Sequence, residues 1–144
     1  MTPAPASSLP LYAAWLVALA ATGGSLFFGE VMGLPPCTLC WYQRIAMYPL
    51  AVLLPIGILL RDARVAYYCL PLVVAGLGIA VYHNLLYYHV IPESLAPCTE
   101  GVSCTTRQIE WLGFVTIPSL ALAGFAAIGA CLAALLAGAR RTRG

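Results

Sequence analysis

The stretch CTLCWYQRIAMYPLAVLLPIGILL (residues 37–60) joins two cysteines to a long apolar run. A helix needs about 20 apolar residues to cross the hydrocarbon core of a bilayer. The run from Trp41 to Leu60 meets this requirement, with Arg44 as its only charged residue. The stretch therefore predicts a membrane-spanning helix with a Cys-x-x-Cys pair at its start.

The rest of the chain repeats this apolar pattern. Of its 144 residues, 62% are hydrophobic and only 8% are charged, which is too apolar for a water-soluble domain of this size. We expect four membrane-spanning segments, at residues 11–28, 41–60, 67–88 and 112–138. Each should be helical, because backbone groups in lipid need partners within their own segment. The predicted fold class is an all-α membrane protein, a single four-helix transmembrane bundle over residues 1–144 with two short extracytoplasmic loops.

The arginines predict which side of the membrane each loop occupies. Arg61 and Arg64 lie between the second and third segments, and Arg140, Arg141 and Arg143 follow the fourth. Because loops rich in arginine stay in the cytoplasm, this side should be cytoplasmic, together with both termini. The opposite side then carries both cysteine pairs and the charged residues Glu30, Glu93, Glu100, Arg107 and Glu110. The net charge of +2 is too small to indicate nucleic-acid binding.

Four of the six cysteines fall at the two extracytoplasmic loops. Cys37 and Cys40 precede the second segment, and five residues separate Cys98 from Cys104, so a local disulfide is feasible there. Disulfides persist in oxidising external compartments. Two cysteine pairs on one face of a membrane indicate thiol–disulfide exchange. A structural disulfide and a four-thiolate zinc site are the alternatives.

The position of Cys40 favours a reactive thiol. Two prolines precede Cys37, and a helix that begins after them places Cys40 in its first turn, near free backbone N–H groups. Arg44 lies four residues further on and shares a helical face with Cys40. A nearby cation stabilises a thiolate, so these features are expected to activate Cys40.

Two motifs resemble those of a known family. The sequence CTLCWYQR (residues 37–44) resembles the signature of the disulfide bond formation protein B (DsbB) family. The sequence CTTRQIEWLG (residues 104–113) is similar to the stretch that follows the last loop cysteine of that family. The best-known enterobacterial members separate their second cysteine pair by a much longer segment. The short spacing here is similar to the short-loop, BdbC-like branch.

This resemblance implies a multi-pass protein-disulfide oxidoreductase of the bacterial inner membrane. Such an enzyme reoxidises a DsbA-like thioredoxin-fold protein and passes the electrons to a membrane quinone, either ubiquinone or menaquinone. The partner is implied to attack at Cys98, with Cys104 and Cys37 as the bridging thiols. The implied site residues are Cys37, Cys40, Cys98 and Cys104 for catalysis and Arg44 and His83 for quinone binding.

Three other readings remain open. A thiol carrier working in reverse would need a cysteine relay across the membrane, but Cys69 and Cys131 are not paired in sequence and are expected to be buried. A vitamin K epoxide reductase-like enzyme would usually carry its loop cysteines upstream of the active pair, whereas here they lie downstream. A non-enzymatic membrane protein would hold its cysteines in a structural zinc or disulfide site.

Overall fold

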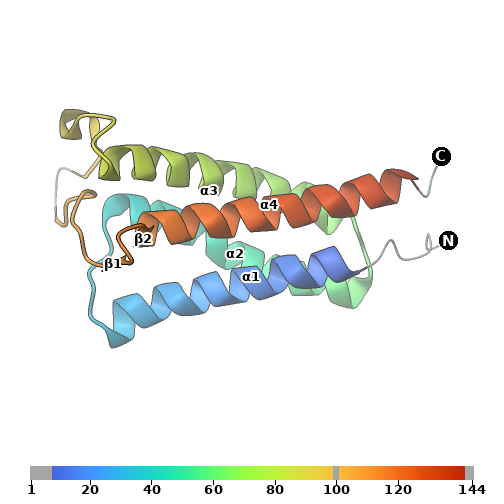
Figure 1. Cartoon of the computed structure of the whole chain (residues 1–144). Coiled ribbons are helices and arrows are strands. Elements are labelled where there is room, and N and C mark those ends of the chain that lie inside the picture. Colours follow the sequence, from blue (N-terminus) through green and yellow to red (C-terminus); the bar gives the residue numbers. More distant parts are fainter. Residues whose placement is uncertain (1–7, 99–100, 142–144) are drawn as a thin grey trace.

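Figure 1 shows the computed structural model of the chain, which describes residues 8–98 and 101–141. Its four long helices are α1 (Leu9–Leu26), α2 (Thr38–Leu60), α3 (Val65–Tyr87) and α4 (Ile117–Arg141), and a short π-helical turn, η1 (Phe27–Val31), extends α1. All four are long and apolar enough to cross a membrane. The predicted all-α four-helix membrane bundle is therefore confirmed. The predicted loop residue Glu100 and the basic residue Arg143 lie outside the described residues.

The helices pack in the ring order α1, α2, α3, α4, since α1 and α3 each contact both α2 and α4. In Figure 1 the α2–α3 link, the start of α1 and the end of α4 lie at one end of the bundle. Arg61 and Arg64 flank that link, and Arg140 and Arg141 end α4. Both cysteine pairs belong to segments at the opposite end, where α2 starts and the chain connects α3 to α4.

The centre of the bundle depends on close contact between α3 and α4. Phe125 of α4 is fully buried, and its ring lies over Gly76 of α3. A β-carbon at Gly76 would lie 2.2 Å from Cε1 of that ring. Small residues at helix interfaces let neighbouring backbones approach closely in membranes, where packing rather than water exclusion drives helix association. Gly76 therefore provides the space that Phe125 fills.

We expect Gly76→Ala to destabilise the bundle by about 1–3 kcal/mol, because the added methyl group overpacks a filled core. Gly78→Ala is the matched control, since Gly78 lies in the same helix and a β-carbon there would contact nothing within 4 Å. Thermal unfolding in detergent should show a lower midpoint for Gly76→Ala and an unchanged or higher one for Gly78→Ala. Equal midpoints for the two variants would contradict this packing.

The predicted start of the fourth helix, at residue 112, is wrong by five residues. Residues 110–116 form a small antiparallel hairpin in which β1 (Glu110–Trp111) pairs with β2 (Val115–Thr116). Leu112 and Gly113 have positive φ angles of 55° and 77° and turn the chain back. The hydroxyls of Thr116 and Ser119 accept hydrogen bonds from each other's backbone N–H groups, as in a capping box, and α4 begins between them at Ile117.

Candidate active site

Cys37 caps the N-terminus of α2. Its backbone is extended (φ −75°, ψ 171°), and its Sγ accepts a hydrogen bond from the backbone N–H of Cys40 at 3.4 Å. The two sulfur atoms lie 2.9 Å apart. Cys40 lies in the first turn, as the sequence predicts, but the sulfur that faces a free N–H group is that of Cys37. The helix N-terminus therefore favours negative charge on Cys37.

The pKa of Cys37 is lowered from 9.0 to about 4. The hydrogen bond from the Cys40 thiol lowers it most, burial opposes the shift, and the nearby His83 ring lowers the pKa further. Because the thiolate is the nucleophile in disulfide exchange, Cys37 is ionised and reactive at neutral pH when both thiols are free.

We expect Cys37 of the reduced protein to react with iodoacetamide at a rate that stays nearly constant down to about pH 5. The pKa of Cys37 is about 4 in the folded protein, whereas the same thiol in the unfolded chain has a pKa of 9.0. Ionisation of Cys37 therefore also increases the free energy of unfolding of the reduced protein. This contribution to stability is complete above pH 9 and is lost as the pH falls to about 4. Peptide mass spectrometry of quenched samples measures the alkylation rate. A rate that falls about tenfold per pH unit below pH 9 would contradict an ionised Cys37.

The second cysteine pair lies directly beside the first. Cys98 and Cys104 form a disulfide with a Cα–Cα distance of 5.8 Å, across a loop in which Gly101 has a φ of 84°. The sulfurs of Cys37, Cys98 and Cys104 all lie within 4.8 Å of one another. Cys104 is only 3% exposed, whereas Cys98 is more open to solvent. Cys98 is thus the more accessible residue of the disulfide, and Cys104 is the buried one.

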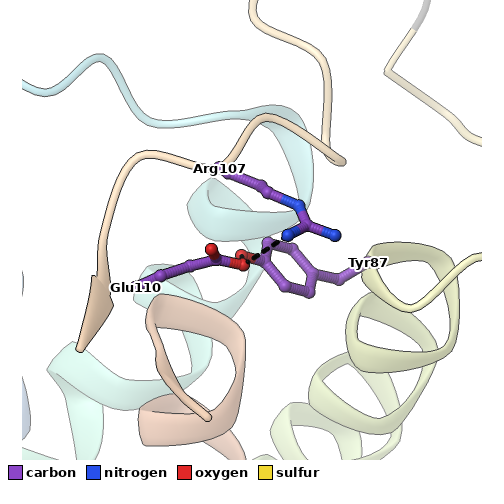
Figure 2. Close-up of polar contacts among 3 residues, drawn as sticks. All are labelled: Tyr87, Arg107 and Glu110. Carbon is purple, nitrogen blue, oxygen red and sulfur yellow. Dashed lines mark hydrogen bonds and ion pairs between the residues drawn. The ribbon is translucent and has the colours of Figure 1, made fainter. Parts of the chain in front are cut away.

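A polar cluster fixes the chain that follows Cys104 (Figure 2). The hydroxyl of buried Tyr87, at the end of α3, donates a hydrogen bond to Oε1 of Glu110 at 2.9 Å. Arg107 forms an ion pair with the same oxygen at 3.0 Å, and its guanidinium lies 5.9 Å from the centre of the Tyr87 ring. Gln108 donates a hydrogen bond to the carbonyl oxygen of Pro35 at 3.0 Å. These contacts join the two loops and hold Cys104 against Cys37.

His83 lies against Cys37, on α3. Its Nε2 is 3.9 Å from Sγ of Cys37 and 3.1 Å from the carbonyl oxygen of Cys104. Its Nδ1 is 3.3 Å from Nε2 of Gln43. His83 is only 2% exposed and Gln43 only 6%, so both are held inside the bundle. The histidine therefore lies beside one cysteine of each pair, Cys37 and Cys104.

An apolar cavity of about 390 Å³ opens beside Cys40, between α1, α2 and α4. Its polar lining includes Cys40, Gln43 and Arg44, and most other lining residues are aliphatic or aromatic. Ligand cavities have volumes of roughly 300–1,000 Å³ and combine apolar walls with a few polar groups. This cavity has the size and lining of a site for an apolar molecule with a polar head.

Arg44 is held at the edge of this cavity. Its guanidinium donates a hydrogen bond to the carbonyl oxygen of Ser25 at 2.9 Å and lies 5.2 Å from the centre of the Trp41 ring. A β-carbon at Gly29, in η1, would lie 2.9 Å from Nη2 of Arg44, so this glycine leaves room for the guanidinium. Within residues 8–98 and 101–141, Arg44 forms no ion pair with a carboxylate. Its positive charge is thus not neutralised by a carboxylate of these described residues.

Comparison with known proteins identifies the family of the chain. The sequence model of the family "Disulfide bond formation protein DsbB" matches residues 7–136. The chain belongs to the DsbB family. It is 47% identical over 115 residues to disulfide bond formation protein C of Bacillus subtilis, covering 80% of this chain and 83% of that protein. It is also 47% identical over 119 residues to a probable disulfide formation protein of Metapseudomonas resinovorans, covering 82% of this chain and 83% of the relative. No solved structure matches the chain.

Membership of the DsbB family confirms the resemblance seen in the sequence, including the short-loop branch, since the Bacillus relative is a disulfide bond formation protein C. The DsbB assignment makes the protein a membrane thiol–disulfide oxidoreductase and favours this reading over a vitamin K epoxide reductase-like enzyme. The structure also opposes a four-thiolate zinc site, because Cys98 and Cys104 are bonded to each other. Cys69 and Cys131 are unbonded; Cys69 is buried in the bundle core, and Cys131 is half-buried and packs against that core.

Proposed function

We propose that this protein reoxidises an extracytoplasmic DsbA-like thioredoxin-fold protein and passes the electrons to a membrane quinone. The observation that carries the proposal is the order of the sulfurs. Cys98 is the more open sulfur, Cys104 and Cys37 lie within 4.8 Å of each other, and Cys40 lines the apolar cavity. Electrons entering at the loop disulfide can therefore reach the cavity through successive thiol exchanges.

The first half-reaction takes place at the loop disulfide. A partner thiolate attacks Cys98, forms a mixed disulfide and releases Cys104 as a thiolate. The second partner thiol then attacks the partner sulfur of the mixed disulfide, so the partner leaves oxidised and Cys98 carries the displaced electron pair. Two electrons now reside in the Cys98 and Cys104 thiols, and the partner has lost two electrons and two protons.

The second half-reaction moves these electrons to the Cys37–Cys40 pair. Cys104 attacks Cys37 of an oxidised Cys37–Cys40 disulfide and displaces Cys40. Cys98 then attacks Cys104, which restores the loop disulfide and releases Cys37. The structure has the pairing that results, with Cys98–Cys104 bonded and Cys37 and Cys40 free. The low pKa of Cys37 makes it a good leaving group in this last step.

The cavity beside Cys40 fits a quinone head group. It places an apolar surface, the Cys40 side chain and the cationic Arg44 around one space. A quinone bound there would supply the capacity to accept two electrons and two protons. Arg44 would stabilise the negative charge that develops as those electrons leave Cys40. We assign Cys40 and Arg44 to this contact with the quinone, and we assign His83 to the thiol exchange, because its ring lies beside Cys37 and Cys104.

Redox energetics also support a quinone. A DsbA-like partner has a potential near about −120 mV, whereas many protein disulfides lie near about −200 mV or below. An ordinary disulfide would therefore reoxidise such a partner against a gap of about 80 mV, or about 3.7 kcal/mol for two electrons. A lipid-soluble oxidant removes this obstacle. The arginines at the far end of the bundle support a bacterial cell membrane orientation with the cysteine pairs outside.

The test is anaerobic addition of reduced thioredoxin-fold partner to the purified protein with a soluble ubiquinone or menaquinone analogue. We expect one quinone to be reduced for each partner dithiol oxidised, measured by quinone absorbance and by trapping of partner thiols. Partner oxidation without stoichiometric quinone loss would contradict the proposed acceptor. The absence of any partner oxidation would contradict the proposed reaction as a whole.

A further inference from the structure

The two-electron-reduced site has the donor set of a metal centre. Sγ of Cys37, Sγ of Cys40 and a ring nitrogen of His83 all lie within 4.8 Å of one another. The first two sulfurs are 2.9 Å apart, and Nε2 of His83 is 3.9 Å from Sγ of Cys37. Two thiolates and one imidazole form a common protein set for zinc, which leaves a fourth tetrahedral position open.

A small void between these donors has room for an ion. It measures about 20 Å³ and is bordered by Cys37, Cys40, His83 and Cys104. About 10–15 Å³ on the same measure holds one water molecule. With Zn–S bonds of about 2.3 Å and a Zn–N bond of about 2.0 Å, tetrahedral geometry separates two sulfurs by about 3.8 Å and a sulfur from a nitrogen by about 3.5 Å. Cys37 would therefore need to move by less than about 1 Å relative to its two neighbours.

We propose that Cys37, Cys40 and His83 bind one soft divalent cation, Zn²⁺ or a similar ion, only when the Cys37–Cys40 pair is reduced. In the oxidised pair both sulfurs are consumed by the disulfide, so the donor set exists in one redox state alone. Binding releases the remaining thiol protons to solvent and leaves both thiolates unavailable for exchange. The bound ion would hold the enzyme in its reduced state.

Gln43 is placed to orient the histidine for this role. Its side-chain amide faces Nδ1 of His83 at 3.3 Å. Rotation of the amide by half a turn presents its oxygen, which accepts the Nδ1–H hydrogen bond. Nε2, which now faces the carbonyl oxygen of Cys104, then has a free lone pair for the metal. Metal-binding histidines in proteins are commonly fixed by such a hydrogen bond on the other ring nitrogen.

The binding test needs neither partner nor quinone, so its outcome is independent of the proposed function. A Cys98→Ser/Cys104→Ser protein, reduced with a phosphine under anaerobic conditions, is titrated with Co²⁺ as a spectroscopic probe for Zn²⁺. We expect one Co²⁺ per chain with a thiolate-to-cobalt charge-transfer band, displaced by Zn²⁺. His83→Ala should weaken binding roughly tenfold or more, since loss of even an indirect partner of a metal ligand costs 10–100-fold. His89→Ala is the control and should bind as before.

A second measurement uses the native cysteine set. Zn²⁺ should slow alkylation of Cys37 and Cys40 in fully reduced wild-type protein and leave Cys69 and Cys131 unaffected, as measured by peptide mass spectrometry. Failure of any Co²⁺ to bind, equal affinity in the His83→Ala variant, or Zn²⁺ protection of Cys69 instead of Cys37 would overturn the site. If the site binds metal and turnover also occurs, Zn²⁺ should inhibit most strongly at limiting quinone, where the reduced pair accumulates.

Discussion

Replacing Cys40 with serine is expected to reduce steady-state quinone reduction to background, a loss on the order of a thousandfold or more. Serine cannot form the Cys37–Cys40 disulfide that, in the proposed reaction, accepts electrons from the Cys98–Cys104 pair. Cys37 keeps its position within 4.8 Å of both loop sulfurs. Its thiolate should therefore still attack Cys104, producing a Cys37–Cys104 disulfide and a free Cys98 thiol, with no net change in oxidation state.

Acid quenching, alkylation and peptide mass spectrometry would show this rearranged disulfide in the Cys40→Ser variant. Cys131→Ala is the control, because Cys131 is a free, half-buried cysteine that packs against the bundle core and should be dispensable for turnover. Normal quinone reduction by Cys40→Ser would refute the assignment of Cys40 as the thiol that delivers electrons. Absence of a Cys37–Cys104 disulfide would show instead that the two pairs do not exchange directly.

The bundle was predictable from sequence because a membrane-spanning helix needs about 20 apolar residues, and runs of that length can be read directly from the sequence. The spans of α2 and α3 differ from the predicted 41–60 and 67–88 by at most three residues at either end. The start of α4 was not predictable in this way. Residues 112–116 are almost as apolar as the helix that follows, and hydropathy cannot register that Leu112 and Gly113 adopt positive φ angles.

The two cysteine pairs were also recognisable as candidate site residues, since thiol–disulfide exchange needs this residue type in pairs on one face of the membrane. Their mutual placement was not, because it depends on contacts between residues far apart in the chain. In the sequence, Tyr87 is one of several aromatic residues near the end of the third apolar segment, yet in the structure it is buried and hydrogen-bonded to Glu110. Gln43 is a polar residue near the start of an apolar helix. This was a signal in the sequence that its side chain has a polar partner inside the bundle, which the structure identifies as His83.

The sequence also could not predict whether His83 lies beside Cys37 or beside Cys40. Residues 40 and 83 are on different helices, and the rotation of α3 decides whether His83 faces the cavity or Cys37. The structure turns it toward Cys37 and Cys104. The two residues predicted to bind the quinone therefore lie in different places, Arg44 at the cavity and His83 beside the sulfur of Cys37.

Arg44→Ala is expected to lower quinone reduction by roughly a hundredfold, as removal of one preorganised charge donor commonly does. The guanidinium lines the cavity beside Cys40 and, in the described part of the chain, has no carboxylate partner, so its charge is available to a developing anion. Exchange between partner and the Cys98–Cys104 disulfide should remain within about twofold of normal, since that disulfide does not depend on the cavity. Single-turnover partner oxidation and steady-state quinone reduction measure the two steps separately.

Gly29→Ala provides a graded version of the same experiment. Its methyl group would lie 2.9 Å from Nη2 of Arg44, and the flexible end of the arginine would have to move away from the position that Ser25 now fixes. We expect a several-fold rise in the KM for quinone, smaller than the effect of Arg44→Ala, because the charge is displaced rather than removed. Gly23→Ala, at a position of α1 with open space around it, should leave the KM unchanged. Normal quinone reduction by Arg44→Ala at limiting quinone would mean that the cation serves only to anchor α2 to α1.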